Sequence, residues 1–91
     1  MDTNQYQQEF GRRVRRRRMA CGLMQKELAE RLDWPQGHVS RLEKGEFLLM
    51  RLERLVLLAD ALMTSADYLL GRLDDPEAIP LAQAATADAC L

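Results

Sequence analysis

The 91-residue sequence has few of the residues that build disulfide frameworks, metal centres and catalytic sites. It contains two cysteines, Cys21 and Cys90, and a single histidine, His38. Two cysteines this far apart lack the spacing of a disulfide framework or a metal cluster, so we expect reduced thiols and no metal or other cofactor. A glycine-rich phosphate loop and a paired nucleophile and base are also missing, so we do not expect an enzyme.

Long apolar runs are absent as well. No segment approaches the roughly 18 apolar residues of a membrane-spanning helix, and the first residues, MDTNQYQQEF, lack the features of a secretory signal. We therefore expect a cytoplasmic protein without membrane contact. Hydrophobic residues make up 47% of the chain and charged residues 30%, which is typical of a folded domain rather than of a disordered chain.

The net charge of -1 conceals an asymmetric distribution of charge. Residues 1–45 carry ten basic side chains against six acidic ones, whereas residues 46–91 carry three against eight. A polyanion would be attracted to the first half of the chain and repelled by the second. The sequence therefore predicts that a polyanion such as nucleic acid would bind in one orientation.

Apolar residues recur at helical spacing along the chain, which predicts an all-α protein. We expect helices over residues 6–20, 25–32, 36–44 and 51–63, and a short last helix that ends at Gly71. Gly22 and Gly45 are placed as C-terminal caps of the first and third helices. The expected domain covers residues 1–71, with residues 1–5 frayed, and residues 72–91 form a tail or a dimerisation helix.

Residues 25–42, QKELAERLDWPQGHVSRL, are the segment around which the rest is organised. Apolar residues keep a helical spacing up to Leu32 and resume it from Val39, so two short helices should meet at the corner Asp33-Trp34-Pro35. Asp33 tolerates the left-handed conformation that a tight corner can require. Such a corner is useful mainly when the second helix must protrude into a partner.

The second helix of this pair carries a polar strip between its apolar positions, made of Gln36, His38, Ser40 and Arg41. Gly37 also lies in this helix, where it costs about 1 kcal/mol relative to alanine. A close approach of the backbone to a ligand would explain a glycine there. The strip is the candidate site.

Six arginines lie in the first helix. Arg18 falls beside the apolar face formed by Phe10 and Val14, so its guanidinium needs a partner if it is buried. Glu43 is the carboxylate that we expect to pair with it. For each of the other arginines, a solvated helix surface and a phosphate contact remain equally open.

The fourth helix is apolar over much of its surface. We expect its buried face to contain Leu52, Leu55, Val56, Ala59 and Leu62. Leu57 and Leu58 widen this stripe, and together with Leu48 and Leu49 they predict an exposed patch that contacts a second subunit or a partner protein. A purely internal role for these leucines remains the alternative.

The segment from Gln25 to Gly45 resembles the helix-turn-helix of the Xre family, the Cro and CI type of phage repressor domain. The residues that carry the resemblance are Gln25, Ala29, Asp33, Val39, Leu42 and Glu43-Lys44-Gly45, followed by ALMTSADYLLG from Ala61 to Gly71. The resemblance covers about Phe10 to Gly71. It implies a compact five-helix, lambda-repressor-like domain whose third helix enters the major groove of a palindromic operator, usually as a homodimer.

The resemblance also implies roles for individual residues. Gln36, Gly37 and Arg41 match positions that read base edges, with Ser40 beside them. Gln25 and Lys44 match positions near the DNA backbone, and Lys26, His38 and Arg15 are further candidates for phosphate or positioning contacts. Arg18 and Glu43 match the family's internal ion pair.

Two functions follow as expectations. The first is a sequence-specific transcriptional regulator, most simply a repressor, that binds double-stranded DNA as a homodimer. The alternative is a protein-interaction module, such as an antitoxin or a restriction-modification controller, that binds a partner protein and regulates its own promoter.

Overall fold

The computed structural model describes residues 2–46 and 50–77 of the chain. In these ranges it contains no strand and five helices: α1 (Thr3–Ala20), α2 (Gln25–Leu32), α3 (Gln36–Glu43), α4 (Leu52–Ala61) and α5 (Ala66–Leu69). The predicted all-α fold is confirmed. None of the helices in the described ranges combines the length and the apolarity that crossing a bilayer requires.

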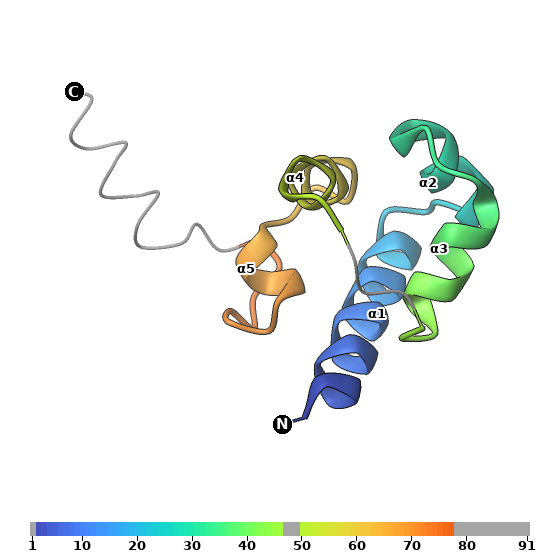
Figure 1. Ribbon diagram of the computed structural model, residues 1–91. Helices are drawn as coiled ribbons and strands as arrows, with labels where there is room; N and C mark the ends of the chain where they lie inside the picture. The colour runs from blue at the N-terminus through green and yellow to red at the C-terminus, as the bar shows by residue number, and fades with distance from the viewer. Residues whose placement is uncertain (1, 47–49, 78–91) are drawn as a thin grey trace.

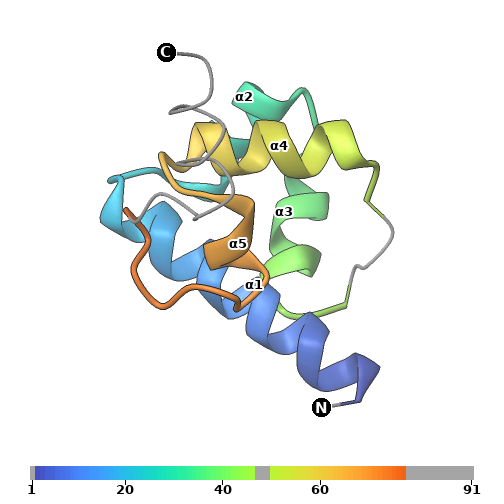
Figure 2. The ribbon, with the colours of Figure 1, turned by 90° about the vertical axis from the view of Figure 1, so that its left-hand side faces the viewer.

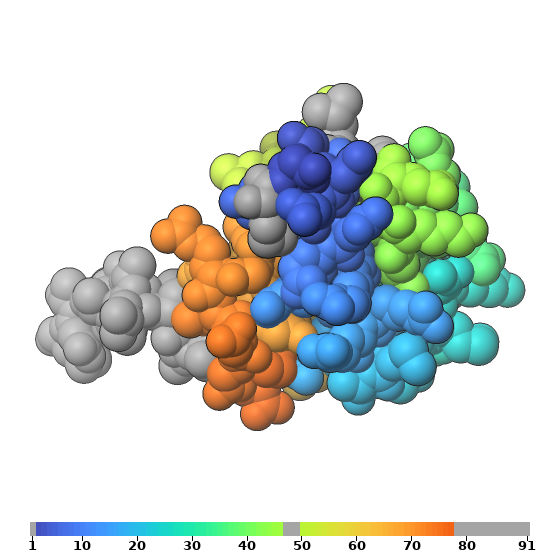
Figure 3. Space-filling model, turned by 90° about the horizontal axis from the view of Figure 1, so that it is seen from below, coloured from blue at the N-terminus to red at the C-terminus, as the bar shows by residue number. Residues whose placement is uncertain are grey.

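Helix α1 lies at the centre of the arrangement, with α5 on one side and the α2–α3 pair on the other (Figure 1). Helix α4 runs across the top of the molecule and packs against α2 and α5 (Figure 2). Seen from below, α1 forms an open face between α5 and α2–α3 (Figure 3). Helix α3 therefore lies at the opposite side of the domain from α5.

All five helices contribute to one apolar core, which consists of Val14, Leu28, Ala29, Leu32, Val39, Leu42, Leu58, Ala59, Leu62, Tyr68 and Leu69. Removal of these side chains from water is the main favourable term in folding. Helix α3 contributes only Val39 and Leu42. The core therefore fixes α3 by one side and leaves its other side available.

Helix α1 begins at Thr3, three residues before the predicted start at residue 6, and Asp2 is its N-cap. The Asp2 carboxylate accepts a hydrogen bond from the Gln5 N–H at 2.9 Å, and the Gln5 side chain accepts one from the Asp2 N–H at 2.8 Å. This reciprocal capping box satisfies two N–H groups that a helix start leaves without partners. The spacing of Asp2 and Gln5 was the signal for it in the sequence.

The predicted glycine caps are confirmed. Gly22 has a φ of 71° after α1 and Gly45 a φ of 78° after α3, both in the left-handed region that favours glycine. Gly45 also lies against α1, because a Cβ at this position would lie 3.0 Å from the Cα of Gln8. The cap of α3 is thus also a contact between α3 and α1.

The buried face of α4 was predicted correctly at Ala59 and Leu62, which are 4% and 0% exposed, and wrongly at Leu52 and Val56. Leu52 and Val56 are 75% and 49% exposed, whereas Leu58 is fully buried with Leu62. The buried positions of α4 are therefore centred on Leu58, Ala59 and the following Leu62. Leucine or valine occurs on almost every side of this helix, so periodicity alone could not select the face.

The burial of Leu58 also corrects the predicted partner patch. Leu58 does not belong to it, because its side chain is in the core, whereas Leu57 is 47% exposed. Leu48 and Leu49 lie outside the described residues. The described part of the patch is therefore reduced to Leu57.

Two arginines of α1 bind the ends of other helices. Arg17 donates to the carbonyl oxygens of Leu62 and Met63 at 2.8 and 3.0 Å, directly after α4. Arg13 donates at 2.9 Å to the carbonyl oxygens of Tyr68 and of Leu73, at and beyond the end of α5. Cations suit these positions because the last carbonyls of a helix lack partners and carry partial negative charge.

A carboxylate supports this contact from within α1. Glu9 accepts a hydrogen bond from Arg13 at 2.9 Å and also contacts Arg12. The hydrogen bond from Arg13 lowers the pKa of Glu9 below its ordinary value, against the opposing effect of burial. Glu9 is thus ionised at neutral pH and holds the Arg13 side chain toward α5.

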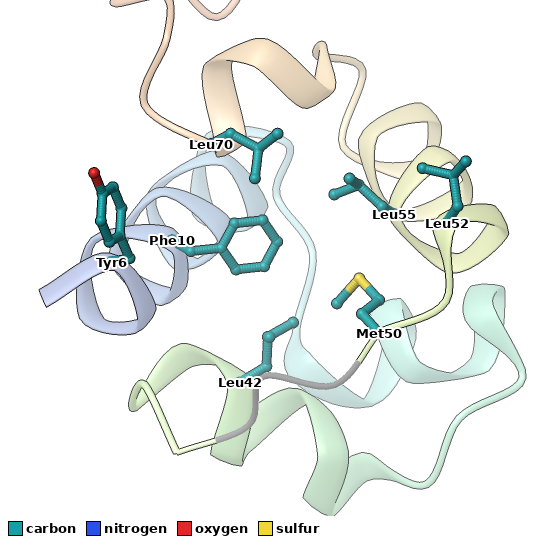
Figure 4. A pocket seen from close by; sticks show the side chains of 7 residues that line it. All are labelled: Tyr6, Phe10, Leu42, Met50, Leu52, Leu55 and Leu70. Carbon is teal, nitrogen blue, oxygen red and sulfur yellow. The ribbon is translucent and has the colours of Figure 1, made fainter. Parts of the chain in front are cut away.

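An apolar pocket of about 330 Å³ opens between α1, α3, α4 and the end of α5. Figure 4 shows that Phe10 of α1, Leu55 of α4 and Leu70, directly after α5, point into it. The complete lining is Tyr6, Phe10, Leu42, Met50, Leu52, Leu55 and Leu70. The pocket lies beside the core on the side of α4 that carries Leu52.

Two helical glycines provide a matched test of helix packing. A Cβ at Gly11 would lie 2.3 Å from the carbonyl oxygen of Leu42, whereas a Cβ at Gly37 would meet no atom within 4 Å. We expect Gly11→Ala to lower the free energy of unfolding by about 1–3 kcal/mol through overpacking. Gly37→Ala should raise it by up to about 1 kcal/mol through helix propensity. Urea unfolding measures both, and equal changes would contradict the close approach of α1 to α3.

Candidate nucleic-acid interface

The corner between α2 and α3 is made by three residues. Asp33 adopts the left-handed conformation, with φ 54° and ψ 45°, as predicted for this position. The N–H of Trp34 then donates to the carbonyl oxygen of Ala29 at 2.9 Å, which closes the end of α2. Pro35 has φ -59° and serves as the N-cap residue of α3. The chain therefore turns into α3 without an intervening loop.

Helix α3 has two faces of opposite character. Val39 and Leu42 are 0% and 1% exposed and anchor the helix in the core. Gln36, Gly37 and Arg41 are exposed on the other face, where Ser40 is partly exposed. Positions 36, 37, 40 and 41 share one side of a helix because it turns once every 3.6 residues. The structure thus brings together all four predicted base-reading residues on one open face.

The dimensions of this face suit the major groove of DNA. Eight residues of α3 make a helix about 12 Å long, and the major groove is about 12 Å wide and admits an α-helix. Helix α3 lies at the edge of the domain, away from α5 (Figure 1). Its polar side is open within the described ranges, because Gln36, Gly37 and Arg41 are exposed.

A buried ion pair fixes α3 relative to α1. Arg18 donates to both carboxylate oxygens of Glu43, at 2.6 and 3.1 Å, and to the carbonyl oxygen of Leu23 at 2.8 Å. The side chains of Arg18 and Glu43 are only 12% and 3% exposed. A bidentate arrangement also restricts orientation, not only distance. This is the partner that the sequence predicted for Arg18.

The same carboxylate also holds Gln25, which the sequence did not predict. The Gln25 side-chain amide donates to Glu43 at 3.0 Å, so the first residue of α2 is attached to the last residue of α3. Gln36 lies at the other end of α3, about 10 Å away along the helix axis. Gln25 is therefore positioned at the end of the polar face, apart from Gln36 and Gly37.

The start of α2 has a partial cap. Met24 makes no side-chain cap, but its N–H donates to the Glu27 carboxylate at 3.0 Å. Lys26 follows Gln25 and is exposed. The N-terminal end of a helix favours anions through its unpaired N–H groups and its dipole. Gln25 and Lys26 are thus placed where a phosphate would be favoured.

His38 is placed differently from the other predicted contact residues. It is half-buried, and its ring lies edge-on to Trp34 with a centroid distance of 6.1 Å. The Arg54 guanidinium lies 5.9 Å from the centroid of the same Trp34 ring. The structure therefore places His38 in a packing contact with Trp34 at the corner, and Trp34 in turn contacts α4 through Arg54.

The basic residues of the first half divide into two groups. Arg12, Arg13 and Arg18 form ion pairs, and Arg17 binds backbone carbonyls. A second group is exposed and makes no ion pair within the described ranges, and it includes Arg15, Arg16, Lys26, Arg41 and Lys44. Sequence reasoning missed the roles of Arg13 and Arg17, although both flank the apolar face of α1. The predicted contacts Arg15, Lys26 and Lys44 belong to the exposed group.

Two short helices, a three-residue corner and an exposed polar face on the second helix define a helix-turn-helix DNA-binding domain. A family model described as a helix-turn-helix domain matches residues 9–70. The chain belongs to this family, and it is a DNA-binding transcriptional regulator. The resemblance seen in the sequence is confirmed.

A solved relative has the same fold. The chain is similar to the restriction-modification controller protein C.AhdI from Aeromonas hydrophila, with 32% sequence identity and a TM-score of 0.62. The match covers 68% of this chain and 92% of the relative. No sequence among the curated proteins matches the chain.

Loss of the Glu43 charge tests the centre of this site. We expect Glu43→Gln to lower the free energy of unfolding by about 1.5–3 kcal/mol, because the buried Arg18 loses a charged hydrogen-bond partner. The matched control is Glu46→Gln, at an exposed carboxylate three residues later, which should change stability by less than about 0.5 kcal/mol. Urea unfolding at low and high salt provides the measurement. Equal losses in both variants would show that the ion pair does not hold α3.

Proposed function

We propose that the protein is a sequence-specific repressor that binds a palindromic operator as a homodimer, with α3 in the major groove. The observation that carries this proposal is the open face of α3. Gln36 and Arg41 are exposed there, opposite the buried Val39 and Leu42. A helix anchored by one face and polar on the other can enter a groove without loss of core contacts.

The side chains on this face have the chemistry of base recognition. Gln36 can pair in bidentate fashion with the N6 and N7 atoms of adenine, and Arg41 with the O6 and N7 atoms of guanine. Each such pair contributes roughly 1–3 kcal/mol of discrimination against a wrong base. Ser40 lies between them on the same face and can donate or accept a hydrogen bond.

Gly37 gives the face a second means of contact. Its φ is not positive and its Cβ direction is open, so the fold itself does not require glycine at this position. The absence of a side chain would let the backbone of α3 approach the bases. Gly37 therefore supports a close fit between the first turn of α3 and the groove.

Several other residues are suited to hold the DNA backbone. Gln25 is fixed by Glu43, and the exposed cations Lys26, Lys44 and Arg15 carry charge that is not neutralised by an ion pair in the described ranges. Contacts to phosphate set the register of a protein on DNA but do not read its sequence. We propose this positioning role for these four residues.

The length of α3 favours a dimer. A helix of about 12 Å spans only about a third of the 34–36 Å that separate successive half-sites on one side of DNA. Two copies would present two such helices to a palindrome. Exposed apolar side chains at Leu52, Leu57 and Leu70 supply surface that a second copy could cover.

Arg41→Ala tests the base contact against a variant with the same change in charge. We expect Arg41→Ala to weaken binding to an operator, obtained by in vitro selection, by about 1–3 kcal/mol and to relax preference at one position of each half-site. Arg72→Ala is the control, since Arg72 is exposed and lies three residues after the end of α5, and α5 is on the other side of α1 from α3. It should leave affinity nearly unchanged. Gel-shift titration measures both variants.

Titrations at several salt concentrations separate base contact from charge. The logarithm of the binding constant should fall with the logarithm of salt by about 0.9 per neutralised phosphate. Equal loss of affinity in Arg41→Ala and Arg72→Ala would contradict the assignment of α3 as the reading helix. A response independent of salt would contradict DNA binding by this surface.

The relative gives a reason for a second, narrower candidate function. That protein is described as a restriction-modification controller, and we propose that this chain also controls a restriction and modification gene pair and binds upstream of its own gene. A separate partner protein stays a prediction from the sequence alone.

The narrower function has its own experiment. The purified protein should bind DNA from upstream of its own gene at least tenfold more tightly than a shuffled sequence of equal length and composition. A reporter driven by that DNA should change its expression when the protein is present, and a decrease would support repression. Selective binding to a palindrome elsewhere, without binding to its own upstream DNA, would reject the controller function and retain the general one.

A further inference from the structure

An arginine from α4 reaches the corner between α2 and α3. Arg54 donates a hydrogen bond to the carbonyl oxygen of Leu32, the last residue of α2. Its guanidinium carbon also lies 5.9 Å from the centroid of the Trp34 ring, in the middle of the corner. Leu32 and Arg54 are 22 positions apart in the sequence, so the contact depends on the packing of α4 against α2. The corner is therefore held from outside the α2–α3 pair.

The end of α2 and the Trp34 ring both suit the chemistry of an arginine. The last carbonyls of a helix lack intrahelical partners and carry partial negative charge, so a cation is favourable there. A guanidinium can donate hydrogen bonds in its plane while its face lies against an aromatic ring. Arg54 is half-buried, and burial makes such contacts stronger than they are in water. One side chain thus contacts both the end of α2 and the corner.

The Trp34 ring connects this contact to the first turn of α3. The ring packs against the core and lies edge-on to His38, with 6.1 Å between the two ring centroids. His38 is half-buried and directly follows the exposed Gln36 and Gly37. A continuous set of contacts therefore runs from Arg54 of α4, through the corner, to the start of α3.

The other contacts that anchor α3 begin later in the helix. Val39 and Leu42 are its buried residues, and Glu43 forms the ion pair with Arg18. Residues 36–38 precede all of these anchors. The place of the first turn of α3 therefore depends on the corner, whereas the rest of the helix is held by the core and by the ion pair.

We propose that Arg54 is a positioning residue for DNA recognition, which fixes the corner from α4 and so sets the place of Gln36 and Gly37. This role rests on the proposed function of α3 as the reading helix. Side chains that recognise a partner need to be held within about 0.5 Å of the productive geometry by neighbours that are themselves locked by packing. Arg54 and Trp34 are such neighbours for the first turn. Arg41 lies beyond Val39 and does not depend on them.

The surroundings of Arg54 distinguish it from the cations proposed to hold DNA phosphates. Lys26 and Lys44 are exposed and make no ion pair within the described ranges. The guanidinium of Arg54 is bonded to a carbonyl oxygen and lies against a ring. Its loss should change the placement of the first turn of α3 and not the number of neutralised phosphates. The salt dependence of binding reports that number.

Base preferences of the full-length protein test the role of Arg54. Gel-shift titrations compare an operator obtained by in vitro selection with operators changed at one base pair of each half-site. Gln36→Ala and Arg41→Ala first identify the base pair that each side chain reads. We expect Arg54→Met to lower the preference at the Gln36 base pair by about 3–10-fold, which is part of the discrimination that one such contact supplies. The preference at the Arg41 base pair should stay within about twofold, as for independent sites.

The matched control is Arg72→Met, which removes the same charge from an exposed residue after α5 and should change neither preference. The chain has a single tryptophan, so fluorescence reports the contact itself. Emission from Trp34 should change in Arg54→Met and stay the same in Arg72→Met. The salt slope of Arg54→Met should equal that of the unmodified protein. A slope smaller by about 0.9 would show a phosphate contact and overturn the positioning role.

Other results would overturn the role of Arg54 and retain α3 as the reading helix. They are unchanged preferences in Arg54→Met, or equal losses at the two base pairs. If Arg54→Met does not fold, Arg54→Lys takes its place, because lysine keeps the charge and lacks the planar group. It should show the same selective loss to a smaller extent, and intact preferences would contradict the role. If Gln36→Ala and Arg41→Ala change no base preference, the proposed function of α3 fails as well.

Discussion

The ion pair between Arg18 and Glu43 is the interaction on which the DNA-binding surface depends. It joins α1 to the last residue of α3, and the same carboxylate holds Gln25 at the first residue of α2. One buried acidic group thus sets the relative position of three helices. A buried charge is costly without partners, and here each carboxylate oxygen is bonded. The polar face of α3 has a fixed orientation for two reasons. This network holds Glu43, the last residue of α3, and Val39 and Leu42 anchor the opposite side of the helix in the core.

The arginines of α1 show how one residue type takes different roles according to its side of a helix. Arg13 and Arg17 bind the carbonyls that end α5 and α4, and Arg18 on the other flank binds Glu43. Arg15 remains exposed and without an ion pair in the described ranges. The basic segment therefore has a largely architectural function: it attaches α1 to the helices on both sides. The cations outside these contacts are the ones proposed to attract DNA.

Local signals in the sequence predicted much of the fold and most of the candidate site. Few residue types tolerate the left-handed conformation, so glycine at 22 and 45 and aspartate at 33 predicted it at these positions. All three residues adopt it. The capping box at the start of α1 is also encoded locally, by the spacing of Asp2 and Gln5. The face of α4 could not be predicted in the same way, because Leu57 and Leu58 satisfy the same pattern and only packing distinguishes them.

By itself, the sequence determined the helices, the corner at Asp33 and the polar face of α3, because backbone conformation and helical periodicity are set by near neighbours. Tertiary structure alone decided that Glu43 binds Gln25 and that Arg13 reaches the end of α5. It also decided that Gly11 is required where α1 meets the end of α3. These contacts join residues distant in the chain, and they depend on distances and helix rotations that follow only from packing the core.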